Sequence, residues 1–328
     1  MLRTRLPRLS EIQRPVRDEL ERVVDELRRI VLSDFPAIGE VNDHLLWARG
    51  KLFRPTLMLL CNRIGARPHP RAVTIAAIVE LVHLATLVHD DAVDHSVLRR
   101  GMPTVNALWS HQTAVILGDF LYSRSISSLA DLGCVDYITV LSKATNEMSV
   151  GELRQLSSCD ALQFTEQDYD RLIACKTASL MSAACELGAA AGDEQYRAPL
   201  ARYGHALGMA FQIADDLLDF TQSEAVVGKP TGQDLREHKV TLPLIAAMRT
   251  MDDAALRTVS AFFADPVPTD AGIDEVTRLV RQHGGLEYAR TRAHQFGERA
   301  AVALLELPDC EETRALRAGV TYVTERKN

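Results

Sequence analysis

An all-α fold in a single domain is the structure that the sequence predicts, and three observations support it. Apolar residues recur at three- and four-residue spacing over most of the 328 residues, which is the period of an amphipathic helix. Strand-like alternation of apolar and polar residues is almost absent, and no Asn-Gly or Asp-Gly hairpin signal occurs. No low-complexity linker divides the chain. We therefore expect one helical domain over residues 1–328.

The helical spacing is interrupted mainly at prolines. Pro36, Pro103 and Pro230 are examples that fall between periodic segments, where a missing backbone N–H does least harm. The stretch 72–88 is apolar nearly all round, which predicts a central and fully packed helix. We expect helices at residues 13–32, 72–94, 104–131, 135–159, 168–192, 196–222, 241–264, 272–283 and 285–306.

Composition favours a cytoplasmic helical enzyme. The net charge of −7 gives no reason to expect a nucleic-acid partner. The six cysteines form no C-x-x-C pair and lie mostly in apolar surroundings, which indicates reduced core thiols rather than disulfides. The first residues lack the apolar run of a signal peptide, and no run of about 18 uncharged apolar residues suggests a membrane span.

Two clusters of aspartates carry most of the functional information. Each has the spacing D-D-x-x-D and each sits in an apolar stretch of helical character. Like charges crowded on a buried helix repel one another, and burial disfavours their ionised form, so two such clusters require a compensating cation. The clusters are Asp90, Asp91 and Asp94, and Asp215, Asp216 and Asp219.

The spacing within each cluster also indicates which cation is bound. Asp90 and Asp94 are four residues apart, as are Asp215 and Asp219, so each pair shares one helix face. Oxygen ligands suit a hard divalent ion, and Mg²⁺ usually completes its shell with water and substrate phosphate. Two facing clusters are therefore expected to hold several Mg²⁺ ions around a diphosphate.

Several basic or polar residues stand near these clusters, although each alone has an ordinary interpretation. Arg99-Arg100-Gly101 follows the first cluster and suits phosphate oxygens, but adjacent arginines are usually solvated. Gln212 shares the face of the second cluster, three residues before Asp215. His83 lies about 20° off the Asp90 face and alone would be a core histidine.

The remaining basic residues follow the same pattern. Lys51 and Arg54 stand at an expected helix start, where the default interpretation is a simple helix entry. Lys176 lies in an apolar helical run, so it either reaches back to solvent or enters a cavity. Lys229 belongs to a glycine-bearing loop and Lys239 follows it; both would neutralise a leaving diphosphate if the loop were a flap.

Together these motifs resemble those of the trans-isoprenyl (polyprenyl) diphosphate synthases over essentially the whole chain. ELVHLATLVHDDAVDHSVLRRGMPTVN is similar to the first aspartate-rich region of that family, and FQIADDLLDF is similar to the second. GKLFRP, GELRQL, CKTASL and GKPTGQDLREHKVTLPL also match, in the order of the family. The resemblance implies a helical bundle around a deep central cavity, Mg²⁺ as cofactor and a homodimer. It also implies transient membrane contact for product release.

The resemblance assigns roles residue by residue. It makes Asp90, Asp94 and Asp215 the direct Mg²⁺ ligands, with Asp91, Asp216 and Asp219 as supporting or alternative ligands. The residues implied to bind isopentenyl diphosphate are Lys51, Arg54, His83 and Arg100. The residues implied around the allylic diphosphate are Arg99, Lys176, Thr177, Gln212, Lys229 and Lys239, among which Lys176, Gln212 and Lys229 are expected to be catalytic.

Two further positions qualify the resemblance. The family often has G-K-R-x-R-P where this chain has Leu52 as the middle residue, but Lys51 and Arg54 remain. Arg326 is a weak match to a terminal arginine found near the homoallylic diphosphate.

The expected mechanism follows from charge. Mg²⁺ and the lysines stabilise the negative charge that develops on the allylic diphosphate as its C–O bond breaks. The allylic cation needs a dry, apolar pocket, because water would otherwise capture it. The isopentenyl double bond attacks head to tail, and a proton is then lost to the released diphosphate. Because the product is again an allylic diphosphate, the cycle repeats.

Product length is expected to depend on Ala85 and Thr86, which stand five and four residues before Asp90. In the family, bulky aromatic residues here stop growth early, so two small residues predict a product longer than geranylgeranyl diphosphate. The cavity floor would then lie near Ile78, Val82 or residues 120–129. A short-chain farnesyl or geranylgeranyl diphosphate synthase is the alternative.

Two other classes of protein remain as alternatives. A terpene cyclase would be helical and Mg²⁺-dependent, but we expect it to have one D-D-x-x-D with an Asn/Ser/Glu triad and to lack the GK…RP and RRG elements. A regulatory subunit of a heteromeric prenyl synthase would not be an enzyme itself. Such subunits usually lose aspartates from these motifs, whereas all six are present here.

Overall fold

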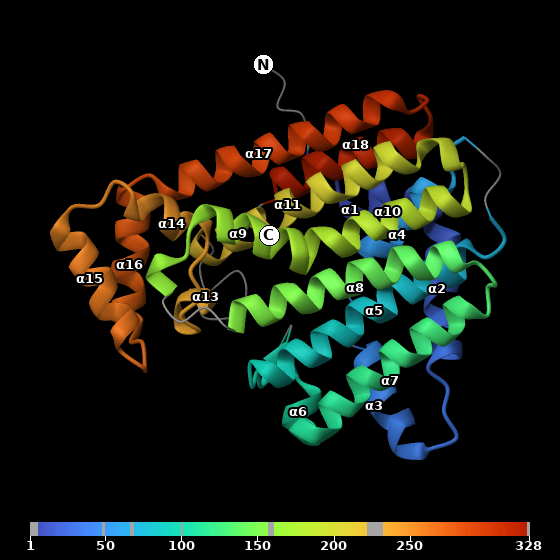
Figure 1. The fold of residues 1–328 in the computed structure, drawn as a ribbon, viewed down its shortest axis with the longest axis horizontal. Coiled ribbons are helices and arrows are strands. Elements are labelled where there is room, and N and C mark those ends of the chain that lie inside the picture. Colours follow the sequence, from blue (N-terminus) through green and yellow to red (C-terminus); the bar gives the residue numbers. More distant parts are fainter. Residues whose placement is uncertain are drawn as a thin grey trace.

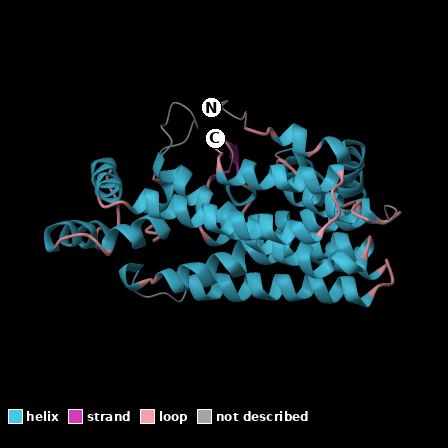
Figure 2. Cartoon of the chain, turned by 90° about the horizontal axis from the view of Figure 1, so that it is seen from above, coloured by secondary structure: helices cyan, strands magenta, loops and turns pink. Residues whose placement is uncertain are grey.

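The computed structural model describes residues 6–47, 50–65, 69–99, 101–156, 161–221 and 232–326. Within these ranges the chain is almost entirely helical, which confirms the predicted fold class (Figures 1 and 2). The long helices are α2 (Arg17–Ile30), α5 (Ala72–Val93), α7 (His111–Ala130), α8 (Val135–Leu156), α10 (Ser179–Ala191), α11 (Arg197–Thr221) and α17 (Gly285–Ala303).

Shorter helices surround this bundle. They are α1 (Leu9–Ile12), α3 (Pro36–Trp47), α4 (Phe53–Asn62), α6 (Val105–Leu108), α9 (Glu166–Ile173), α13 (Gln233–Arg236), α14 (Leu242–Met248), α15 (Asp253–Ala264), α16 (Asp270–Gln282) and α18 (Glu311–Thr324). In Figure 1, α15 and α16 project from one end of the bundle, and α3 and α6 lie along its lower edge. The most extensive contacts join α11 to α17 and α10, and α5 to α7.

The predicted central helix is α5. Its residues from Ile75 to Val82 are all buried, and it packs against α2, α4 and α7. By length and composition alone, α5 and the run Glu166–Ala191 could cross a membrane. Both are mostly buried inside the fold, which is how the core helices of a folded domain behave.

Some expected helices are divided, because side chains cap the backbone at the breaks. The expected helix 104–131 stops after α6 and restarts at α7, where Ser110 Oγ accepts from the Thr113 N–H at 3.0 Å. The expected helix 241–264 likewise splits into α14 and α15, with Asp252 accepting from the Ala255 N–H at 2.8 Å. Such caps compete with continuation of the helix.

Other elements differ from the prediction in kind. Helices α3 and α18 occupy segments for which no helix was predicted. A short hairpin pairs β1 (Leu98–Arg99) with β2 (Met102–Pro103), and Gly101 with φ of +77° supplies its turn. The expected helix 168–192 contains a π-helical segment, Ala174–Ala178, between α9 and α10. This segment carries two of the predicted site residues.

Candidate active site

The first aspartate cluster ends α5. Three carboxylates at a helix C-terminus are doubly unfavourable, because they repel one another and face the negative end of the helix dipole. Asp91 is buried, with 6% of its surface exposed, and Arg99 of β1 binds it through Nε at 2.8 and 2.9 Å to the two carboxylate oxygens. The hairpin therefore folds a cation back over the cluster.

The other two carboxylates of this cluster also face cations from distant parts of the chain. Lys176 Nζ lies 3.7 Å from Asp90 Oδ2, and Lys239 Nζ lies 3.2 Å from Asp94 Oδ2. Burial raises the pKa of Asp90 above its ordinary value, and nearby Glu152 adds to this effect, while Lys176 opposes it. Cations from three different elements thus converge on α5.

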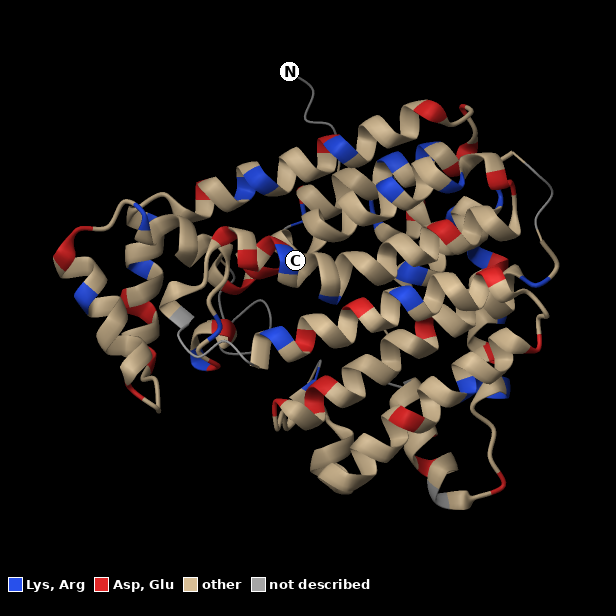
Figure 3. Cartoon of the chain, in the orientation of Figure 1, with Lys and Arg blue, Asp and Glu red and all other residues tan. Residues whose placement is uncertain are grey.

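The second cluster lies near the C-terminal end of α11 and is held mainly by neutral donors. Asp216 accepts from Tyr169 Oη at 2.5 Å and from Gln212 Nε2 at 2.8 Å. Asp219 accepts from the backbone N–H groups of residues 233 and 234, each at 3.0 Å. Asp215 is the exposed member and forms an ion pair with Arg326. Figure 3 shows charged residues gathered at this end of the bundle.

Burial governs the protonation of this second cluster. It raises the pKa of Asp216 to about 7, against which the donors Tyr169 and Gln212 act. It also raises the pKa of Asp219, with the two backbone N–H groups opposing. Asp234 has a raised pKa for the same reason, strengthened by Asp216 and Asp219. An excess of buried negative charge of this kind favours a bound cation.

The π-helical segment joins the two clusters. Lys176 reaches the first cluster at Asp90, whereas the adjacent Thr177 donates through Oγ1 to Gln212 Oε1 at 2.8 Å and so reaches the second. π-Helical turns often occur at functional sites. Two glycines bring neighbouring helices close: a Cβ on Gly151 would lie 2.8 Å from Cys175, and one on Gly208 would lie 2.6 Å from Ala178. The segment is therefore held tightly between α8 and α11.

The model of the family described as polyprenyl synthetase matches residues 35–278, a span that contains both clusters and the segment between them. The chain belongs to the polyprenyl synthetase family. It is therefore a prenyltransferase, as the resemblance of its motifs implied.

Relatives within the polyprenyl synthetase family are similar over almost the full chain. The octaprenyl diphosphate synthase of Haemophilus influenzae is 34% identical over 322 residues, which cover 98% of this chain and 97% of that protein. A crystal structure of a decaprenyl diphosphate synthase from Rhodobacter capsulatus has a TM-score of 0.92 at 37% identity, covering 98% of this chain and 100% of the other. These similarities favour a medium- or long-chain synthase over the short-chain alternative.

A third member of the family provides information about the ligands. The polyprenyl synthase from Caulobacter crescentus CB15, in complex with calcium and isoprenyl diphosphate, has a TM-score of 0.94 at 29% identity, covering 99% of this chain and 100% of that one. In the present chain, the described residues contain no group of three His, Cys, Asp or Glu side chains arranged to hold a metal alone. The all-oxygen donor set nevertheless fits a hard divalent ion that takes further ligands from water and phosphate.

The structure brings most of the predicted polyprenyl synthetase site together. The residues linked by the contacts above are Asp90, Asp91, Asp94, Arg99, Lys176, Thr177, Gln212, Asp215, Asp216, Asp219 and Lys239. Lys176 is half-buried and points into the site rather than back to solvent. Arg100 and Lys229 lie outside the described residues.

The described residues assigned to isopentenyl diphosphate lie at the start of α4 and on α5. Arg54 follows Phe53, which stacks on Phe211 with ring centroids 5.9 Å apart. Phe211 precedes Gln212, so the start of α4 lies against the second cluster. The guanidinium of Arg326 lies 4.4 Å from the Phe211 ring centroid. Lys51 is exposed just before α4, and His83 is half-buried on α5.

Two residues of the site were missed by sequence reasoning. Glu152 Oε2 lies 2.5 Å from Lys176 Nζ, closer than Asp90. Glu152 belongs to the GELRQL motif, which matches the family but did not predict a role for this residue. Tyr169 contacts Asp216 from α9, and nothing in the sequence around it indicated that contact. Both residues are identified only by their contacts with segments that are distant in sequence.

Proposed function

We propose that this polyprenyl synthetase uses Mg²⁺ to condense isopentenyl diphosphate head to tail with an allylic diphosphate, repeatedly, to give a medium- or long-chain all-trans polyprenyl diphosphate. The observation that carries the proposal is the pair of aspartate clusters, tied together by Lys176 and Thr177. A structural cation site would not require basic residues from so many separate elements around it.

Asp90, Asp94 and Asp215 are the residues that would hold the metal ions. Each of them pairs with the flexible side chain of a lysine or an arginine, which can move aside when a metal ion binds. When bound, Mg²⁺ supplies charge stabilisation to the departing diphosphate. Asp91, Asp216 and Asp219 have their oxygens occupied by Arg99, by Tyr169 and Gln212, and by backbone N–H groups, which suits supporting roles.

The chain's cations would bind the allylic diphosphate around this centre. Lys176 and Lys239 already lie beside carboxylates that a metal ion would engage, so both are placed to turn towards phosphate oxygens. Burial works to lower the pKa of Lys239, but Glu237 and Asp94 outweigh it and the pKa is raised. Lys239 therefore remains a cation throughout the neutral range.

The second substrate would lie on the α4 side, where we assign Lys51, Arg54 and His83 to isopentenyl diphosphate. Its double bond attacks the allylic carbon as the C–O bond breaks, and the proton lost from the new unit passes to the released diphosphate. The apolar faces of α5 exclude water from the allylic cation. Ala85 is buried, and we assign its small side chain, with that of Thr86, to the wall that the growing tail would pass.

A homodimer is part of the proposal, because α7 and α8 leave apolar side chains exposed. Ile116, Leu153 and Val150 are 67%, 63% and 37% exposed, and they share these two helices with the exposed Val115 and Tyr122. Patches of this kind usually mark contact surfaces. The apolar product further implies a transient membrane contact at release, and we place the enzyme in the cytoplasm.

The test is a product-length assay with labelled isopentenyl diphosphate, several allylic starters and Mg²⁺. We expect products longer than geranylgeranyl diphosphate, and none in excess chelator. The matched control is the same protein with Asp215→Ala, in which we expect the helical fold to remain and one metal-facing carboxylate to be lost. Full turnover in chelator, or products ending at farnesyl or geranylgeranyl diphosphate, would contradict the proposal.

A further inference from the structure

A buried chain of hydrogen bonds runs from α9 to the π-helical segment. Tyr169 is 1% exposed, and its hydroxyl donates to Asp216 Oδ2 at 2.5 Å. Gln212 Nε2 donates to the other oxygen of the same carboxylate, and Thr177 Oγ1 donates to Gln212 Oε1, both at 2.8 Å. These three hydrogen bonds link Tyr169 to Thr177, the residue next to Lys176, through Asp216 and Gln212.

The carboxylate of Asp216 is turned away from the open site. Only 6% of Asp216 is exposed, whereas the adjacent Asp215 side chain is 56% exposed. Consecutive helical residues point about 100° apart, so the two carboxylates serve different faces of α11. With both oxygens already accepting hydrogen bonds, Asp216 acts as an internal brace between helices.

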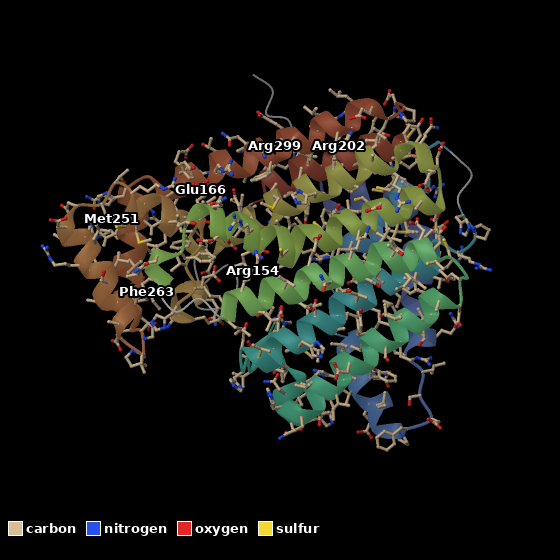
Figure 4. All side chains as sticks on the ribbon, viewed as in Figure 1. Arg154, Glu166, Arg202, Met251, Phe263 and Arg299 are labelled. Carbon is tan, nitrogen blue, oxygen red and sulfur yellow. The ribbon has the colours of Figure 1, made fainter. Side chains whose placement is uncertain are left out.

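Helix α9 is anchored well enough to position its tyrosine. Glu166, labelled in Figure 4, accepts from Arg249 at 2.6 Å and from Tyr288 at 2.9 Å, which joins the start of α9 to α14 and α17. One turn later, Arg292 of α17 donates to Asp170 at 3.0 Å. Tyr169 lies between these two attachments, so its hydroxyl has little freedom to move.

We propose that Tyr169 is a positioning residue for the prenyl transfer, which orients Asp216 and, through Gln212 and Thr177, the segment that presents Lys176 to the allylic diphosphate. The inference rests on the function proposed above. Tyr169 itself contacts no reacting atom. Its hydroxyl holds the Asp216 carboxylate, which in turn holds Gln212, while Gly151 and Gly208 keep the segment that carries Lys176 closely packed.

A second buried tyrosine provides the matched control. Tyr203 is 0% exposed and donates its hydroxyl to the Leu316 carbonyl at 2.9 Å. Tyr203 lies on α11, the helix that carries Asp216, but 13 residues earlier, which is about 20 Å along the helix. Tyr169→Phe and Tyr203→Phe each delete one buried, hydrogen-bonded hydroxyl. A purely structural role for Tyr169 would make the two variants behave alike.

The experiment measures steady-state kinetics, thermal melting and binding of Mg²⁺-pyrophosphate by calorimetry for both variants. Removing a partner of a site residue typically reduces activity or affinity by about 10- to 100-fold. We expect that loss in kcat and in pyrophosphate affinity for Tyr169→Phe, with both values near wild type for Tyr203→Phe and similar melting temperatures for the two. Wild-type kcat and affinity in Tyr169→Phe, or equal losses in both variants, would overturn the inference.

A further variant keeps the test decisive if Tyr169→Phe does not fold. Asp216→Asn retains an acceptor oxygen for Tyr169 but presents an N–H group to Gln212, so the chain of hydrogen bonds is broken in its middle. We expect losses of the same size, and unchanged kinetics and affinity would overturn the inference. Failure of the wild-type protein to turn over prenyl diphosphates would instead contradict the proposed function.

Discussion

The two aspartate clusters have the same spacing, but the protein holds their carboxylates by different chemistry. On α5, Asp90, Asp91 and Asp94 each face a charged side chain from another element. On α11, Asp216 and Asp219 are held by a phenol, an amide and two backbone N–H groups, and within the described part of the chain Asp215 is the one member paired with a cation. The same motif is thus compensated by charge in one place and by hydrogen bonds in the other.

The difference has a consequence for the response of each cluster to a metal ion. Lys176 and Lys239 pair with Asp90 and Asp94, so a metal ion bound to these carboxylates would release both lysines for phosphate oxygens. Burial is partly uncompensated at Asp90 of the first cluster, but at both Asp216 and Asp219 of the second, where it raises the pKa of Asp216 to about 7. We therefore expect the second cluster to depend more strongly on a bound cation.

The largest effect is expected from removing a metal-facing carboxylate. Asp90→Ala and Asp215→Ala should each reduce kcat by several orders of magnitude, since one charge-stabilising element contributes roughly 10²–10³ in rate. Circular dichroism should show an intact helical fold in both. A variant of either cluster that turns over at the wild-type rate would remove that cluster from the mechanism.

The next effect separates the two substrates. Lys176→Ala should act mainly on the allylic diphosphate, because Lys176 lies between the clusters. His83→Ala should act mainly on isopentenyl diphosphate. The measurement is KM for each substrate at saturating concentration of the other, with changes of about tenfold expected for a lost charged hydrogen bond of roughly 1.5 kcal/mol. Identical changes for both substrates would show that the subsites are assigned wrongly.

Protonation of the second cluster should be visible in stability. The pKa of Asp216 is about 7 in the folded protein against an ordinary 3.8, so this group favours the folded state below about pH 4, and its contribution is lost as the pH rises through 7. Asp90, Asp219 and Asp234 shift in the same direction.

Thermal melts of metal-free protein across this range provide the measurement. We expect the buried carboxyl groups with raised pKa to lower the melting temperature as the pH rises from 4 to 7. Asp216→Asn should make this fall in melting temperature smaller. Mg²⁺ with pyrophosphate should restore stability most strongly near pH 7. A melting profile that Asp216→Asn leaves unchanged would contradict the role given to that carboxyl group.

A smaller effect is expected at Arg326. Its guanidinium pairs with the exposed Asp215 and stacks over Phe211, so it occupies a carboxylate that a metal ion would use. The Asp215 side chain is 56% exposed but that of Arg326 only 8%, so the pair is half-exposed and contributes on the order of 1 kcal/mol; Arg326→Gln should therefore tighten Mn²⁺ binding about fivefold. Electron paramagnetic resonance measures the free ion. Weaker Mn²⁺ binding would mean that Arg326 supports the metal site instead of competing for it.

How far the sequence predicts the molecule depends on whether a feature is local. Most of the long helices and the six aspartates follow from periodicity and spacing, and α5 was predicted as the central helix because it is apolar nearly all round. The contacts of Glu152 and Tyr169 join segments more than 20 residues apart, so no local pattern reveals them. The π-helical segment likewise packs closely against Gly151 and Gly208, which lie more than 20 residues away from it in sequence, so no local pattern reveals that packing.

The smallest effect on turnover is expected from substitutions just before the two aspartate clusters. These positions also allow the two clusters to be compared directly. Five residues before its first aspartate, each cluster has a buried alanine, Ala85 or Ala210. Four residues before, α5 has Thr86, whereas α11 has Phe211. Because both residues are small on α5 only, we propose that the growing tail passes beside α5. Ala85→Phe should therefore shorten the product while the first condensation keeps its rate within about twofold, a free-energy change of roughly 0.4 kcal/mol.

Ala210→Phe is the matched control. Ala210 is fully buried and Ala85 is 2% exposed, so both substitutions overpack the core by about 1–3 kcal/mol and lower the melting temperature. Its product length should stay that of the wild type, because the tail does not pass along α11. Chromatography of the labelled products distinguishes these outcomes. Equal shortening by both substitutions, or none by Ala85→Phe, would place the wall of the elongation cavity elsewhere, deeper along α5 near Ile78 or on α7.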